Sequence, residues 1–186
     1  MGFFKSLKLF IRLMKDAPKI KAAMDQQQDA YAAMTAEALS TLPDEDLYFA
    51  AMIRAERKIN YESMEESFAT LSQPQKVLYA LSTLESEVNN GGLCQFFVNS
   101  SRMMAPYVSD YLQIIGADAH KQLFDGFIQT NGIDVSDLSS FRIHRTADFE
   151  KQAKRYPFDE YDDAFYALPS LEEPLTAYIK ANLSHF

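Results

Sequence analysis

The chain has 186 residues, enough for one domain of ordinary size, and its 47% hydrophobic content excludes a disordered protein. Only 6 Gly and 7 Pro are present, too few for the tight turns of a β-sandwich or barrel, whereas Leu, Ala, Glu and Lys favour helices. The formal net charge of −8 predicts a protein that repels nucleic acid and attracts basic partners. The single cysteine, Cys94, cannot form an internal disulfide, so we expect a cytoplasmic location.

The first 21 residues differ in charge from the remainder. They carry six basic side chains and one acidic one, a charge of +5, which leaves −13 for residues 22–186. The spacing i, i+3, i+7, i+10 predicts an amphipathic helix over residues 3–15 whose basic face holds Lys5, Lys8, Arg12 and Lys15. We therefore expect a basic N-terminal helix or arm over residues 1–21, ahead of an acidic helical domain over residues 22–186. Such an arm packs on its own domain, packs on a second subunit, or contacts a membrane surface through residues 3–15.

Helical periodicity continues along most of the chain. Pro18 is expected to end the first helix or to start the next one. A later helix, which we expect to be central, carries apolar residues at i, i+1, i+4, i+7 and i+11, namely Val77, Leu78, Leu81, Leu84 and Val88. Residues 60–72 are ambiguous, and residues 133–145 are the most irregular or strand-like part. These patterns predict one compact all-α domain of about eight to ten helices.

Motifs for known chemistry are missing from the sequence. It has no His or Cys spacing for zinc, no Gly-rich phosphate loop and no Gly-x-Ser-x-Gly elbow. We therefore expect no metal, no cofactor and no enzymatic activity. Cys94 follows a predicted helix break, where a thiol can be activated, but we favour a small buried side chain because no His is identifiable as its base.

The polar stretch 85–100 is the least generic part of the chain. Glu85 and Glu87 are two positions apart on a predicted helix and so point to different faces, which argues against a paired general acid and base. Gly91 and Gly92 are expected to end this helix with a glycine in the left-handed cap conformation. We interpret the stretch as a structural corner, with Glu85, Asn89 and Gln95 bonded to helix ends and an aromatic pair in the core. A ligand-binding corner is the alternative.

This stretch resembles the motif of the DMP19-like family, over about residues 40–180. The residues that carry the resemblance are Glu85, Glu87, Asn89, Asn90, Gly91, Gly92, Gln95, Phe96, Phe97 and Asn99. The resemblance implies an all-helical acidic protein, expected to be a homodimer. It also implies a DNA mimic, whose carboxylates imitate phosphates and occupy the DNA-binding face of a transcription regulator. Such a protein binds no nucleic acid itself.

Clusters of acidic residues are the candidates for a mimicking surface. Duplex DNA presents about one charge per 1.7 Å of its axis, so a mimic requires an ordered row of carboxylates. The candidates are Asp44, Glu45, Asp46, Glu62, Glu65, Glu66, Asp159, Glu160, Asp162, Asp163, Glu172 and Glu173. An ordinary solvated acidic surface has the same composition. Two further functions stay open, a general interaction or immunity-type protein without mimicry, and a small-ligand binder or enzyme at the corner formed by residues 85–99.

Overall fold

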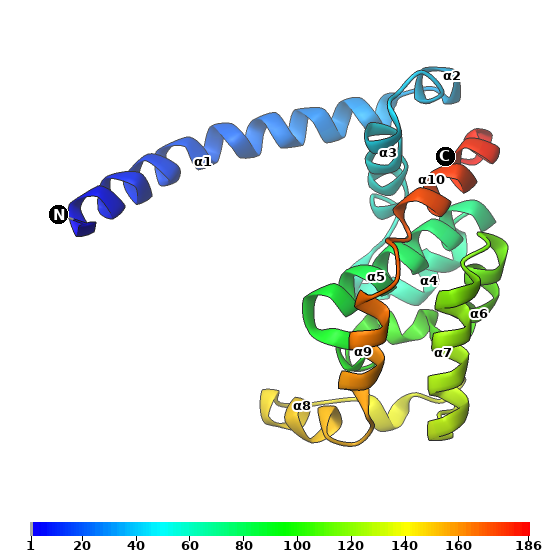
Figure 1. Cartoon of the computed structure of the whole chain (residues 1–186). Helices are drawn as coiled ribbons and strands as arrows, with labels where there is room; N and C mark the ends of the chain where they lie inside the picture. The colour runs from blue at the N-terminus through cyan, green and yellow to red at the C-terminus, as the bar shows by residue number, and fades with distance from the viewer. Residues whose placement is uncertain (1) are drawn as a thin grey trace.

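A computed structural model describes residues 2–186, with side chains described for residues 17–145 and 147–186. Over this range the chain forms ten α-helices and four short 3-10 helices and contains no strand, which confirms the predicted all-α domain. Figure 1 shows α1 projecting away from the other helices, which gather into one body. The bounds are α1 Gly2–Ala33, α2 Ala36–Leu39, α3 Asp44–Glu56, η1 Tyr61–Ser63, α4 Met64–Thr70, α5 Gln73–Val98, η2 Ser100–Met104, α6 Ala105–Ile114, α7 Asp118–Asn131, η3 Ser139–Phe141, α8 Thr146–Ala153, α9 Phe158–Tyr166, α10 Glu172–Ala181 and η4 Leu183–His185.

Helix α5 lies at the centre of the body, as its periodicity predicts. It contacts α3, α6, α8, α9, α10 and η2. Its five predicted core positions, Val77, Leu78, Leu81, Leu84 and Val88, are all fully buried. The helix begins with a capping box, in which the Ser72 hydroxyl accepts the N–H of Gln75 and the Gln75 side chain accepts the N–H of Ser72.

The prediction that Pro18 ends the first helix is wrong. Helix α1 runs from Gly2 to Ala33 with Pro18 inside it. An internal proline removes one backbone hydrogen bond and costs about 3 kcal/mol, which a long helix can absorb without ending. The boundary predicted at residue 21 therefore falls within a continuous helix. The side chains of residues 1–16, including the predicted basic face, lie outside the described residues.

The C-terminal end of α1 is fixed to the body by Arg54 of α3. The guanidinium donates to the carbonyls of Tyr31, Ala32 and Met34, at 3.2, 3.0 and 2.5 Å. It also donates to the carbonyl of Phe186 at 3.1 Å. A cation at the carbonyl end of a helix stabilises the helix dipole. One side chain thus joins α1, α3 and the C-terminus.

The two segments that the sequence left ambiguous are now defined. Residues 60–72 form η1 and α4, and residues 133–145 form an irregular connection that contains only the short helix η3. Among the residues that the structure describes, no helix is long and apolar enough to cross a membrane.

Candidate functional site

The polar corner is a kink that separates two helical parts of α5, which confirms the predicted helix end at the two glycines. Gly91 has φ −163° and ψ 22°, and Gly92 has φ 80° and ψ 172°. The Gly92 conformation lies outside the left-handed helical region that we predicted, in a region that is open almost only to glycine. A Cβ at Gly92 would also collide with the Asp162 carboxylate. Both the backbone conformation and the surrounding space therefore require glycine here.

The Glu87 side chain connects the two helical parts of α5 to each other and to the following helix η2 through hydrogen bonds. Its half-buried carboxylate accepts hydrogen bonds from Gln95 Nε2 at 2.6 Å, Asn99 Nδ2 at 2.9 Å and Ser101 Oγ at 2.9 Å. Bonds to an ionised acceptor are stronger than neutral ones. Most of the acceptor capacity of Glu87 is thus used inside the fold.

Two other carboxylates bond to the starts of helical segments. Glu85 accepts the N–H of Leu171, just before α10, at 2.9 Å. Asp162 of α9 accepts the N–H of Leu93, just after the kink, at 2.8 Å. Each satisfies a backbone donor that has no partner within its own helix. Burial raises the pKa of Asp162, and the hydrogen bond from Leu93 opposes that rise.

The predicted bonding of the corner is therefore partly wrong. Glu85 does satisfy a helix end, but that end belongs to α10 and not to the corner. Gln95 bonds the side chain of Glu87 instead of backbone. Asn89 is exposed, as is Asn90 beside it, and no hydrogen bond of the Asn89 side chain occurs among the described residues. Asp162, predicted for the partner-binding surface, supplies the missing cap.

The apolar residues of the corner lie in the core. Phe96 and Phe97 are fully buried, with ring centroids 5.7 Å apart. Cys94 is buried too, in agreement with the favoured interpretation. Burial, followed by the Asp162 charge, raises the pKa of the Cys94 thiol to about 11. The thiol is therefore protonated at neutral pH, which is unfavourable for a nucleophile.

The predicted acidic residues lie on several elements and differ in their contacts. Three are engaged within the fold: Asp44 pairs with Lys180 at 2.7 Å, Asp46 accepts from the Tyr31 hydroxyl at 2.8 Å, and Asp162 caps the corner. The remaining nine side chains are exposed and make no hydrogen bond or ion pair to another described residue. They are Glu45 on α3, Glu62 on η1, Glu65 and Glu66 on α4, Asp159, Glu160 and Asp163 on α9, and Glu172 and Glu173 on α10.

The acidic helices α3 and α10 lie against each other, whereas α9 packs on α5. In Figure 1 a single connection leads from the end of α9 to the start of α10, which lies beside α3. Burial raises the pKa of Tyr48, and the charges of Glu85 and Glu172 raise it further, so acids of α5 and α10 lie near α3. Glu62, Glu65 and Glu66 form a separate group on η1 and α4.

A groove that the sequence did not predict runs between α1, α3 and α5. It consists of two cavities of about 290 and 590 Å³ that share Met52, Glu56, Ser82 and Ser86. Of the described residues that line it, none is Lys, Arg or His, and four are acidic: Glu45, Asp46, Glu56 and Glu87. The groove is also partly apolar, because Phe49 is 51% exposed and Tyr61 is 66% exposed. Its walls come from segments far apart in sequence, so no local pattern indicates it.

Metal binding finds no support in the described part of the chain. No group of three or more His, Cys, Asp or Glu side chains there is arranged to hold a metal ion.

Comparison with known proteins agrees with the motif. The family model described as DMP19-like protein matches residues 69–182, which include the last two residues of α4 and all of α5 to α10. Neither curated proteins nor solved structures gave a match.

Proposed function

We propose that this chain, which belongs to the DMP19-like protein family, is a non-enzymatic acidic protein that binds a basic DNA-binding partner in place of DNA. The observation that carries the proposal is the set of exposed carboxylates on α9 and at the start of α10. From residue 159 to residue 173 the sequence has six acids and no base. Five of these six, all except Asp162, are exposed and make no hydrogen bond or ion pair through their side chains with another described residue.

The spacing on α9 supports mimicry. Asp159 and Asp163 are one helical turn apart, a rise of about 6 Å along the helix axis. Phosphates of one DNA strand rise about 3.4 Å per step and also move around the axis, so these two carboxylates are spaced like neighbouring phosphates of one strand. Helical neighbours of like charge repel each other by a few tenths of a kcal/mol. A basic partner relieves that repulsion when it binds.

The mechanism is competition for one surface. Carboxylates of α9 and α10 accept hydrogen bonds from the Lys and Arg side chains with which the partner holds phosphates. The charge of −13 on residues 22–186 steers the partner during the encounter and accelerates association. Binding should weaken steeply as the salt concentration rises.

The test uses purified helix-turn-helix regulators, each bound to a fluorescent operator duplex. We expect the chain to displace the duplex from at least one regulator, and the Asp159→Asn, Glu160→Gln, Asp163→Asn triple variant to displace it at least tenfold more weakly. Glu62→Gln, Glu65→Gln, Glu66→Gln is the matched control, because it removes the same charge from η1 and α4. Absence of displacement, or equal loss in both variants, would refute the proposal.

A general interaction protein without mimicry is the second candidate, and the partly apolar groove favours it. A partner held by Phe49 and Tyr61 would bind with little dependence on salt. Raising NaCl from 50 to 200 mM distinguishes the two functions. The affinity for the partner should fall at least tenfold if carboxylates replace phosphates, and should change little if the contact is apolar. A small-ligand site at the corner has less support, because Glu85, Glu87 and Asp162 are already bonded within the fold.

A further inference from the structure

Helix α1 is exposed over most of its described length. Among the side chains of residues 17–30, all are exposed except Gln28, which is half-buried. Figure 1 shows the helix meeting the body only near its C-terminal end. A helix in water gains most of its stability from packing an apolar face, so one that stands alone is marginally stable.

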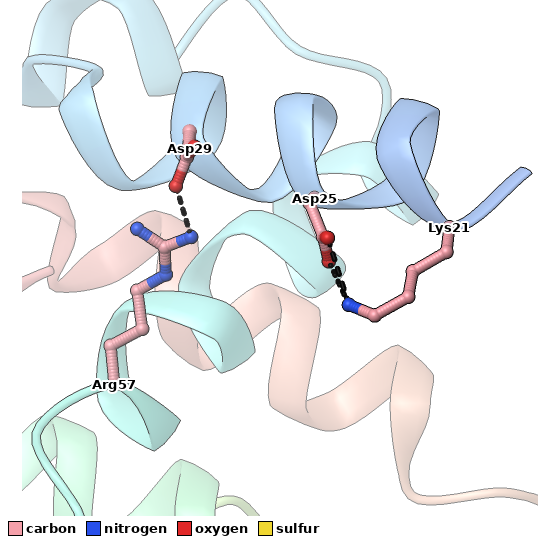
Figure 2. A network of polar contacts seen from close by, with 4 residues as sticks. All are labelled: Lys21, Asp25, Asp29 and Arg57. Atoms are coloured by element: carbon pink, nitrogen blue, oxygen red, sulfur yellow. Dashed lines mark hydrogen bonds and ion pairs between the residues drawn. The ribbon is translucent and has the colours of Figure 1, made fainter. Parts of the chain in front are cut away.

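The apolar and polar faces of α1 differ in their contacts. Asp29 pairs with Arg57 of α3 at 2.6 Å, and Asp25 pairs with Lys21 at 2.8 Å, as Figure 2 shows. Ile20 and Met24, by contrast, are 52% and 54% exposed. With Tyr31 they recur at i, i+4 and i+11, so they follow one line along the helix. The polar flank of α1 thus has partners, whereas this apolar line is open towards its N-terminal end.

The apolar line leads into the acidic groove. Met24 and Tyr31 form part of the groove wall, facing Phe49 of α3 and the carboxylates of Glu45 and Asp46. A segment that fits this groove must be apolar on one face and basic on its flanks. Residues 3–15 have this composition in the sequence, with eight large apolar side chains and four basic ones.

The N-terminal segment cannot reach the groove of its own chain. Residues 2–33 form one continuous helix, and the groove wall is part of that same helix. Residue 10 and residue 28 are therefore about 27 Å apart along the axis. Only the segment of another molecule can enter the groove.

We propose that two copies of the chain pair their α1 helices antiparallel, so that the basic segment 3–15 of each lies in the acidic groove of the other. The contact is isologous and closes as a two-fold dimer, because each copy supplies both an arm and a groove. Pairing covers Ile20 and Met24 and neutralises the excess positive charge of the arm. The inference rests on the groove and on α1 and is independent of DNA mimicry.

The test is a complementary charge exchange in the full chain, read by light scattering after size exclusion. The arm variant is Lys5→Glu, Lys8→Glu, Arg12→Glu, Lys15→Glu, and the groove variant is Glu45→Lys, Glu56→Lys. We expect the unaltered chain to be dimeric and each variant alone to be monomeric, because like charges then meet. An equimolar mixture of the two variants should be dimeric again, since every arm finds a groove of opposite charge. A mixture that stays monomeric, or variants that stay dimeric alone, would overturn the proposal.

A single substitution on each face of α1 gives a second test. Met24→Glu places a charge on the apolar line and should raise the dimer dissociation constant at least tenfold. Ala22→Glu is the matched control, because residue 22 is exposed and lies on roughly the opposite face of the helix. It should leave the dimer intact, and circular dichroism verifies that both variants are folded. Equal effects of the two substitutions, or a monomeric unaltered chain that binds phosphatidylserine vesicles through its arm, would contradict the α1 pairing.

Discussion

The kink at Gly92 offers the sharpest test of how the corner is held. Replacing Gly92 by Ala forces an L-residue into a conformation that costs about 1–3 kcal/mol. The new Cβ also displaces the Asp162 carboxylate and breaks the hydrogen bond that it accepts from the Leu93 N–H, worth about 1.5–3 kcal/mol. We expect Gly92→Ala to lower the free energy of unfolding by about 2.5–6 kcal/mol, summed from these two costs. Urea unfolding followed by circular dichroism at 222 nm measures the change.

Gly132 supplies the matched control. It has φ 59° and ψ 37°, and a Cβ added there meets no atom within 4 Å. Gly132→Ala should therefore cost only the backbone strain, about 1–2 kcal/mol. In an Asp162→Ala background the cost of Gly92→Ala should fall to its strain alone, because the collision has been removed. Equal costs at the two glycines, or no coupling between positions 92 and 162, would refute this account of the corner.

Three further predictions concern single side chains of the same region. Glu87→Ala should destabilise the protein by about 3 kcal/mol and Glu87→Gln by about half as much, because Gln keeps one acceptor oxygen for the bonds that join α5 to η2; equal losses in urea unfolding would contradict this role. Burial raises the pKa of Asp162 above the ordinary value of about 3.9, so the native state holds this proton more tightly than the unfolded chain. The free energy of unfolding of the unaltered protein should consequently decline relative to that of Asp162→Asn as the pH rises from about 4. Parallel pH profiles of the two proteins would show that the pKa of Asp162 is not raised. The Cys94 thiol, with its pKa raised to about 11, should react with Ellman's reagent at pH 8 only after unfolding in urea, and rapid labelling of the native protein would show that the corner opens.

Local sequence patterns predicted those parts of the fold that depend on neighbouring residues. The core face of α5 and the burial of Phe96 and Phe97 follow from spacing and residue type. Residue type also marked the position of the kink, because two adjacent glycines favour a helix end, but it did not predict the backbone conformation of Gly92. Element types along the chain were accordingly predictable.

Contacts between distant segments were not predictable in this way. Asp162 caps a residue 69 positions away, and Glu85 caps one 86 positions away. A pattern restricted to one helix holds no information on such pairs, so Asp162 resembled any other surface acid. The groove escaped prediction for the same reason, since α1, α3 and α5 form its walls together. Pro18 was misjudged because propensity predicts the cost of a proline but not whether a long helix tolerates that cost.

The extent of the family match separates the two binding features. Residues 69–182 include α9 and α10 with their exposed carboxylates, and the α5 floor of the groove. The α1 and α3 walls of the groove lie before residue 69, as does the basic arm. The exposed carboxylates of α9 and α10 thus lie inside the matched region, whereas two walls of the groove lie outside it. Pairing through α1 depends on residues outside that region, so removing the arm should abolish the dimer while leaving the acidic surface of α9 able to compete with DNA.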